Sequence, residues 1–227
     1  MRASKARRQV RRGALRGAAL RQQARTVLDR LLAEYPDAHC ALDFRNAYQL
    51  LVATILSAQC TDKRVNMVTP ALFRKYPTAR ALAGASRDDV EAMIRSTGFF
   101  RNKAKSLLGM AGAVTEEHAG KIPDTMDALT HLPGVGRKTA NVVLGNAFEK
   151  NEGIVVDTHV TRLSQRLGLT RAGTAEKIEQ SLLPLFPRDR WTILSHLFIE
   201  HGRRVCAARN PNCAECVLAD VCPSAQF

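Results

Sequence analysis

The chain has 227 residues, which is enough for one large domain or two small ones with a sizeable hydrophobic core. Hydrophobic residues make up 45% of it, as in ordinary globular proteins, and no apolar run approaches the roughly 18 residues of a membrane span, so we expect no membrane segment. The formal net charge of +13 favours a polyanionic partner, because neutralising phosphates releases condensed counterions.

Most of the positive charge lies at the N-terminus. The first 25 residues hold nine basic residues and no acidic one: Arg2, Lys5, Arg7, Arg8, Arg11, Arg12, Arg16, Arg21 and Arg25. The segment has no apolar h-region, which excludes a secretory signal peptide, although its arginine content weakly resembles that of a mitochondrial transit peptide. We expect residues 1–17 to form a disordered basic arm that binds polyanions, with the transit peptide as the alternative.

Helical periodicity begins after this arm. Apolar residues recur at helical spacing from Leu20 to Leu32 and predict an amphipathic helix that ends near Tyr35. Asn46, with Gln49 three residues later, is a capping-box variant. It opens a segment that is apolar almost all round, so we expect a central buried helix there.

The remainder of the chain also has the pattern of helices. We predict them at residues 62–76, with a kink or restart at Pro70, and at 87–95, 102–117, 124–132, 137–148, 158–167, 175–183 and 191–204. No strand-like alternation is present, and the apolar run at 154–156 is too short to found a sheet. The predicted fold class is all-α.

A glycine-rich turn separates two of the predicted helices, within the sequence LPGVGRKTANVV at 132–143. Gly134 and Gly136 can take positive φ, and the turn around Val135 then leaves backbone N–H groups pointing outward at the start of the next helix. Such a turn suits one DNA phosphate, whatever the base sequence, and Arg137 adds positive charge. The alternative is a plain connector between helices.

Lys138 and Asp157 are candidate catalytic residues. Lys138 is expected in the first turn of a helix, where the macrodipole and partial burial both favour a neutral, nucleophilic amine; the alternative is a second phosphate contact. Asp157 precedes another predicted helix and suits its N-cap. A carboxylate fixed there near a lysine also stabilises developing positive charge and takes up protons, and spacing alone does not separate the two roles.

Six cysteines are present, and four of them gather near the C-terminus, separated by six, two and five residues: Cys206, Cys213, Cys216 and Cys222. Without a secretion signal, metal ligation is favoured over a disulfide framework. Four such thiolates suit a [4Fe–4S] cluster or tetrahedral zinc, and the single C-x-x-C pair favours iron–sulfur modestly. Cys40 and Cys60 stand apart, and we interpret them as buried small hydrophobes.

These blocks together resemble the endonuclease III family. The resemblance rests on LPGVGRKTANVVLGNAF followed by VDTH, on LSAQCTD at 56–62, and on HGRRVC with the cysteines after it, and it covers residues from about 20 to 224. It implies a two-lobed helix-hairpin-helix DNA glycosylase fold. One lobe is a helical barrel at 38–156 with its hairpin motif at about 124–148, and the other is an iron–sulfur lobe made of 18–37 and 157–227.

The resemblance also implies an activity. It assigns the attack on C1′ of a damaged nucleotide to Lys138 and an assisting role to Asp157, so the expected enzyme is a bifunctional DNA glycosylase and abasic-site lyase of base excision repair. The implied substrates are oxidised pyrimidines and abasic sites in double-stranded DNA. The four C-terminal cysteines would then hold a [4Fe–4S] cluster, acting as a structural staple.

Further DNA contacts follow from the same resemblance. Gln59, in LSAQ, would fill the gap left by an extruded nucleotide, and Phe99, after the glycine of TGFFRNKA, would be the wedge; a polar helix end and a core aromatic are the respective alternatives. Relatives commonly use an aliphatic wedge, so the choice between Phe99 and Phe100 stays open. Arg209, in the first cysteine loop, would touch the DNA backbone.

Two other functions compete with this interpretation. An adenine mismatch glycosylase shares the hairpin, the aspartate and the cluster, but it lacks the nucleophilic lysine and has a further C-terminal domain. A non-catalytic helix-hairpin-helix module would need the glycines but neither Lys138 nor Asp157. We expect a monomer in the bacterial cytoplasm, associated with the nucleoid, or a mitochondrial or nuclear protein if the source is eukaryotic.

Overall fold

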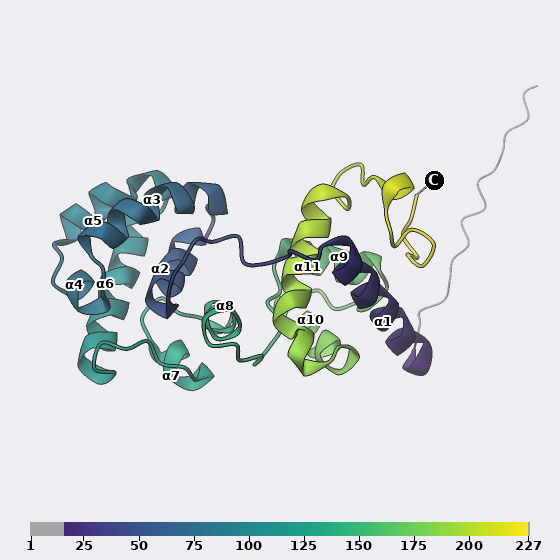
Figure 1. Cartoon of the computed structure of the whole chain (residues 1–227), viewed down its shortest axis with the longest axis horizontal. Coiled ribbons are helices and arrows are strands. Elements are labelled where there is room, and N and C mark those ends of the chain that lie inside the picture. The colour runs from purple at the N-terminus through teal and green to yellow at the C-terminus, as the bar shows by residue number, and fades with distance from the viewer. Residues whose placement is uncertain (1–15, 227) are drawn as a thin grey trace, which may run out of the picture. The chain divides into compact units, whose positions relative to one another are not determined.

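The computed structural model describes residues 16–226, so the expected basic arm lies almost entirely outside the described residues. Within that range the chain forms α-helices joined by loops and short 3-10 turns, and no strand, which confirms the all-α prediction (Figure 1). None of the helices in the described part combines the length and the apolar character needed to cross a bilayer.

The chain divides into two compact units. The central unit consists of His39–Val155 and Arg188–His196, and the terminal unit consists of the chain up to Ala38, Val156–Pro187 and the segment from Leu197 onward. The predicted iron–sulfur lobe included all of 157–227, whereas Arg188–His196 belongs to the central unit. The reason is local bonding: Thr192 donates from its backbone N and from Oγ1 to Oδ1 of Asn151, at 3.0 and 2.7 Å.

Seven helices of the central unit appear in blue to teal in Figure 1. They are α2 (Ala47–Ser57), α3 (Asp62–Lys75), α4 (Ala79–Ala83), α5 (Arg87–Ile94), α6 (Phe100–Glu117), α7 (Met126–His131) and α8 (Arg137–Ala147). Helix α2 contacts α3, α6 and α8 and is buried over most of its length, so the predicted central helix is confirmed. Helix α3 continues through Pro70 without a break.

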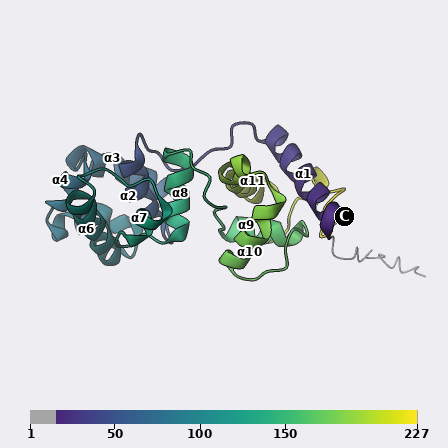
Figure 2. The ribbon, with the colours of Figure 1, turned by 90° about the horizontal axis from the view of Figure 1, so that it is seen from below.

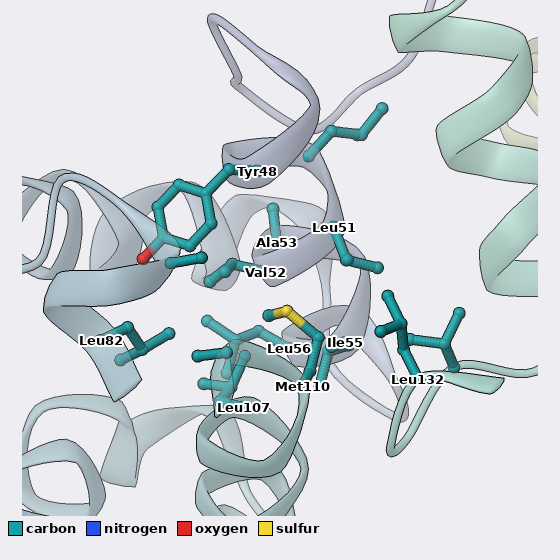
Figure 3. Packing of buried hydrophobic residues seen from close by; sticks show 14 of the residues in the cluster. Tyr48, Leu51, Val52, Ala53, Ile55, Leu56, Leu82, Leu107, Met110 and Leu132 are labelled. Carbon is teal, nitrogen blue, oxygen red and sulfur yellow. The ribbon is translucent and has the colours of Figure 1, made fainter. Parts of the chain in front are cut away.

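Apolar side chains from several helices form the core around α2. Figure 3 shows Leu56 of α2 facing Leu107 and Met110 of α6, and all three are fully buried. Removing a side chain of this size from water contributes roughly 1.5–3 kcal/mol. The hydroxyl of Tyr48, buried in the same core, donates to the carbonyl of Tyr76 at 2.9 Å.

Side chains fix where these helices begin. Oδ1 of Asn46 accepts from the backbone N of Gln49 at 3.0 Å, and Oε1 of Gln49 accepts from the backbone N of Arg45 at 2.9 Å, so the predicted capping box is present one residue displaced. Thr78 caps α4, which has only five residues. The sequence analysis missed α4 because so short a helix has no measurable periodicity.

The terminal unit joins the two ends of the chain. Its helices are α1 (Gly17–Glu34), α9 (Thr158–Arg166), α10 (Ala175–Leu182) and the part of α11 (Trp191–Arg204) from Leu197 onward. Figure 2 shows the C-terminal segment alongside α1. Gln23 of α1 donates from Nε2 to the carbonyl of Val221 at 2.8 Å, and Arg30 donates from Nη1 to the carbonyl of Val217 at 2.9 Å.

Candidate functional site

The hairpin between α7 and α8 is built around one positive-φ glycine. Gly134 has φ +77°, and a Cβ added there would lie 2.5 Å from Cβ of Ser106, so only glycine fits. Gly136, in contrast, has φ −93° and open space around it, so the expectation of positive φ at both glycines is wrong for Gly136. The side chain of Val135 between them is buried in the core, which anchors the turn.

The second helix of the hairpin, α8, begins without a side-chain cap and has a positively charged first turn. Gly136 is its N-cap and provides no side-chain hydrogen bond, and no acidic residue stands in its first turn. Arg137 and Lys138 occupy that turn and are exposed. The backbone N–H groups of a helix start together with two cations make a site suited to a phosphate.

Lys138 is exposed, so the expected partial burial is not observed. The buried face of α8 instead carries Ala140, Asn141, Val143 and Leu144. Lys138, the second residue of α8, lies outside this face, so its amine is available to an incoming substrate.

Asp157 is the N-cap of α9, as one of its two predicted roles required. Its Oδ1 accepts from the backbone N of Val160 at 2.8 Å, and the side chain is half-buried. Ile154 and Val156 just before it are buried, which fixes the start of the helix. Asp157 belongs to the terminal unit and Lys138 to the central unit.

Gln59 and Phe99 both have backbones in the left-handed region. Gln59 follows α2 with φ 52°, and Phe99 precedes α6 with φ 48°. Left-handed backbone is uncommon for residues other than glycine and concentrates at functional sites. Both side chains are exposed, and Phe99 is 62% exposed, the same value as Met67 of α3.

The two neighbouring phenylalanines differ in their surroundings. Phe100 is half-buried and packs against the core, and the guanidinium groups of Arg95 and Arg101 lie 5.7 and 5.6 Å from its ring centroid. Phe99 has no such burial. Of the two rings, Phe99 is therefore the one presented at the surface.

The four C-terminal cysteines line one cavity in the terminal unit, together with apolar residues such as Leu163 and Val205. All four are free thiols. Within residues 16–226, no three histidine, cysteine or acidic side chains converge closely enough to hold a single metal ion. The four thiols share one cavity, and four cysteine thiolates are the ligand set that holds an iron–sulfur cluster.

Helix α9 connects Asp157 to this cysteine site. Arg166, the last residue of the helix, donates from Nη1 to Sγ of Cys206 at 3.2 Å and to the carbonyl of Ala207 at 2.7 Å. The guanidinium thus holds the first residues of the cysteine loop and places a positive charge beside one sulfur. Arg209, in the same loop, is exposed and is followed by Asn210 with φ 51°.

Burial governs the titration of two of the four sulfurs. It raises the pKa of the Cys216 and Cys222 thiols, and nearby cysteines raise it further. Ionised thiolates at these two positions therefore require a nearby positive charge, which a bound metal centre would supply. His201 lies beside them, with Nε2 at 3.3 Å from Sγ of Cys216.

Three residues that structure these sites were not predicted from the sequence: Lys103, Arg166 and His201. Lys103 is a buried cation on the apolar face of α6, which also carries Ala104 and Leu107. A charge within an otherwise apolar helical stripe was a readable signal for it. Arg166 and His201 gave no such signal, because their partners lie 40 and 15 residues further along the chain.

A helical hairpin with a cationic first turn and a four-cysteine site define a class of DNA repair proteins. Residues 52–188 match the model of the HhH-GPD superfamily of base excision DNA repair proteins, and residues 206–222 match the iron–sulfur binding domain of endonuclease III. The second match begins at Cys206 and ends at Cys222, the first and last cysteines of the site.

Individual relatives narrow this class to one family. The chain is 56% identical over 209 residues to the endonuclease III of Synechocystis sp., covering 92% of this chain and 95% of that protein. It is 40% identical over 206 residues to the endonuclease III of Bacillus subtilis, covering 90% and 94%. A solved structure of a trapped endonuclease III–DNA covalent intermediate superposes with a TM-score of 0.85 at 42% identity, covering 90% of this chain and 96% of that one.

The chain belongs to the endonuclease III family. It is accordingly a DNA glycosylase and abasic-site lyase of base excision repair, with a [4Fe–4S] cluster as its cofactor. The iron–sulfur prediction is thereby confirmed over zinc, and the non-catalytic binding module is set aside.

Proposed function

We propose that this enzyme removes oxidised pyrimidines from duplex DNA and cleaves abasic sites, with Lys138 as its nucleophile and Asp157 as the acidic partner. The observation that carries the proposal is the exposed amine of Lys138 in the first turn of α8, directly behind the Gly134 turn. A phosphate bound at the hairpin would bring the neighbouring sugar towards that amine.

The hairpin would bind DNA through its backbone. The N–H groups of Gly134 and Gly136, with the guanidinium of Arg137, supply donors and charge for one phosphate, while the N–H of Val135 holds the turn by donating to the carbonyl of Leu132 at 3.1 Å. These contacts read no base, so they position any sequence equally. Lesion choice then depends on which nucleotide leaves the stack most easily.

The chemistry would proceed in two bond-breaking stages. As the bond between C1′ and the damaged base breaks, its electron pair leaves with the base, and the carboxylate of Asp157 stabilises the positive charge that develops on the sugar. Nζ of Lys138 adds to C1′ and loses one proton; the C1′–O4′ bond then breaks, O4′ takes up a proton, and a protonated Schiff base forms between Nζ and C1′. The Schiff base acidifies C2′, and loss of a C2′ proton expels the 3′ phosphate; water then hydrolyses the imine and frees the amine.

Gln59 and Phe99 would open the duplex. Extruding a nucleotide costs a few kcal/mol, and the vacated space must be filled. Both residues are exposed on left-handed turns of the central unit, and Phe99, rather than the half-buried Phe100, presents its ring to solvent. We therefore assign the wedge to Phe99 and the gap-filling amide to Gln59.

Cys206, Cys213, Cys216 and Cys222 would be the cluster ligands, since all four line one cavity. When bound, the cluster supplies a rigid centre that holds the loop from Ala207 to Asn212, and through it Arg209, for contact with the DNA backbone. No step of the glycosylase or lyase reaction requires electron transfer. We infer a monomer that acts on the chromosome in the bacterial cytoplasm, in keeping with its bacterial relatives.

Borohydride trapping tests the nucleophile. Incubating the enzyme with a duplex that contains thymine glycol, in the presence of borohydride, is expected to give a covalent protein–DNA adduct, and Lys138→Ala should abolish it. Lys121→Ala, which removes another exposed lysine of the central unit, should leave the adduct unchanged.

The alternative outcomes are distinct. An adduct that persists in Lys138→Ala would assign the nucleophile elsewhere. No adduct with the unmodified enzyme, together with excision of adenine from a mismatched duplex, would favour the adenine mismatch activity.

A further inference from the structure

Lys103 is a buried cation that joins two segments of the central unit. Lys103 is a residue of α6 and is only 5% exposed. Nζ donates to the carbonyl of Leu56 at 2.8 Å and to the carbonyl of Thr97 at 2.8 Å. One ammonium therefore bonds two pieces of backbone that are 41 residues apart along the chain.

Both acceptors lie at the ends of helices. Leu56 is the last residue but one of α2, and Thr97 is the last residue of a 3-10 helix at Arg95–Thr97. Carbonyl groups at helix ends have no partner within the helix and carry partial negative charge, so a cation is favourable at both. The ammonium of Lys103 caps the two ends at once.

Each capped end leads directly into a left-handed turn. Gln59, with φ 52°, follows Leu56 by three residues, and Phe99, with φ 48°, follows Thr97 by two. The backbone N–H of Lys103 also donates to the carbonyl of Phe99 at 3.1 Å. Left-handed backbone at residues with a Cβ persists only where the surroundings fix it, and Lys103 supplies bonds beside both turns.

Burying an ammonium group at position 103 costs desolvation free energy. Burial lowers the pKa of Lys103, which means that the protein holds a charge where its surroundings disfavour one. An apolar side chain would suit the neighbouring face of α6, where Ala104 and Leu107 are fully buried. The bonds to the two carbonyls are what a leucine or methionine at this position cannot supply.

We propose that Lys103 is a positioning residue that locks the Gln59 turn and the Phe99 turn together, so that the two side chains enter the duplex as one rigid pair. This inference rests on the proposed roles of Gln59 and Phe99 in opening the duplex. Because the helix ends that lead into the two turns are bonded to the same ammonium, a shift of one turn is transmitted to the other. Without that ammonium, each turn would move independently and each insertion would be separate.

A double-mutant cycle tests the coupling. The readout is the fluorescence of 2-aminopurine placed opposite a tetrahydrofuran abasic analogue in a duplex bound by the holoenzyme, which rises as the bases unstack. With Lys103 present, Gln59→Ala and Phe99→Ala are each expected to lower the opening equilibrium, and the double variant to differ from the product of the two effects by about tenfold. In the Lys103→Met background the two effects should multiply, because the coupling is lost.

Two controls separate positioning from stability. Tyr48→Phe removes another buried hydrogen bond of the central unit, between the Tyr48 hydroxyl and the carbonyl of Tyr76, and should leave the coupling intact. Lys103→Gln, whose amide keeps two donors on a shorter side chain, gives a second variant should Lys103→Met fail to fold. Cleavage of an abasic site in an unpaired bubble, which needs no opening, should stay within about twofold of the unmodified rate in either variant.

The outcomes are distinguishable. Coupling that survives in Lys103→Met and in Lys103→Gln overturns the inference. The inference is also overturned if either variant cleaves abasic sites equally slowly in paired and in bubble substrates, because that result indicates a purely structural role. If neither Gln59→Ala nor Phe99→Ala alters opening, the wedge assignment is wrong and the inference falls with it. The borohydride adduct on Lys138 is unaffected by either result, so the nucleophile is judged separately.

Discussion

Tyr35 and His201 share a buried hydrogen bond of 2.9 Å between Oη and Nδ1, and Nε2 of the same histidine lies 3.3 Å from Sγ of Cys216. Burial lowers the pKa of His201 to about 4, so its imidazole is neutral at pH 7. A neutral imidazole carries one ring proton, and a thiolate bound to iron only accepts, so in the holoprotein that proton would lie on Nε2 and Nδ1 would accept from the tyrosine hydroxyl. Tyr35, the C-cap of α1, would thereby fix a hydrogen bond to Cys216, one of the four proposed cluster ligands.

Replacing Tyr35 by Phe should shift the reduction potential of the cluster to a more negative value. A hydrogen bond to a ligating sulfur stabilises the reduced, more negative state, and losing the hydroxyl frees His201 to adopt the other tautomer. Tyr48→Phe is the matched control, because it also removes one buried hydroxyl bond, worth about 1 kcal/mol, but in the central unit. Voltammetry of both holoproteins measures the difference; equal potentials would refute the assigned role of the Tyr35 hydroxyl.

Asp157→Asn should separate the two roles of this residue. Asparagine caps helices as well as aspartate does, so the acceptor for the backbone N of Val160 remains and the free energy of unfolding should change little. The negative charge is lost, and excision should slow by about 10²–10³-fold. Asp157→Ala should lose the same activity and, in addition, about 1 kcal/mol of stability.

Thr174→Ala serves as the control for Asp157, since it removes the N-cap of α10 in the same unit and should lower stability with little effect on excision. Urea titrations and single-turnover excision rates provide the two measurements. Full activity of Asp157→Asn would reduce the residue to a cap.

Much of this molecule could be predicted from local patterns. The apolar run after Asn46 gave the central helix, because a segment without a polar face has to be buried from all sides. Asp157 was predictable as a cap because the bond to Val160 spans only three residues. The cysteine spacing indicated a cluster for the same reason, since all four cysteines fall within one short segment.

What could not be predicted depends on contacts distant in sequence. The need for glycine at 134 comes partly from Ser106 on another helix, whereas Gly136 meets nothing and has ordinary backbone angles. The exposure of Lys138 depends on which face of α8 the core takes up. The hydrogen bond from Lys103 to the carbonyl of Leu56 spans 47 residues, and no local pattern predicts it.

Removing the cluster should loosen the terminal unit while leaving the central unit folded. Two side chains of α1 hold the cysteine segment: Gln23 donates to the carbonyl of Val221, and Arg30 donates to the carbonyl of Val217. Both carbonyls lie between Cys216 and Cys222. Hydrogen exchange after chelation is therefore expected to show lost protection at 205–222 and weakened protection in α1. Protection of α2 should be unchanged, and its loss would mean that the cluster stabilises both units.

Gly134→Ala and Gly136→Ala form a matched pair that tests the hairpin. At Gly134 a new Cβ would meet Ser106 Cβ at 2.5 Å on a backbone with φ +77°, so the turn has to shift; we expect a loss of about 1–3 kcal/mol in stability and weaker binding to undamaged duplex DNA. At Gly136 nothing lies within 4 Å of the new Cβ and φ is −93°, so the fold should persist. Both variants are compared by thermal unfolding and by fluorescence anisotropy with a labelled duplex.

The DNA affinity of Gly136→Ala carries the stronger test. A methyl group at the N-cap of α8 stands next to the N–H groups that would receive the phosphate, while the folded hairpin is retained. Weaker binding at unchanged melting temperature would therefore indicate that the phosphate approaches the backbone at Gly136 itself. Unchanged binding by Gly136→Ala together with weak binding by Gly134→Ala would show that the shape of the turn matters and that the phosphate lies away from Gly136.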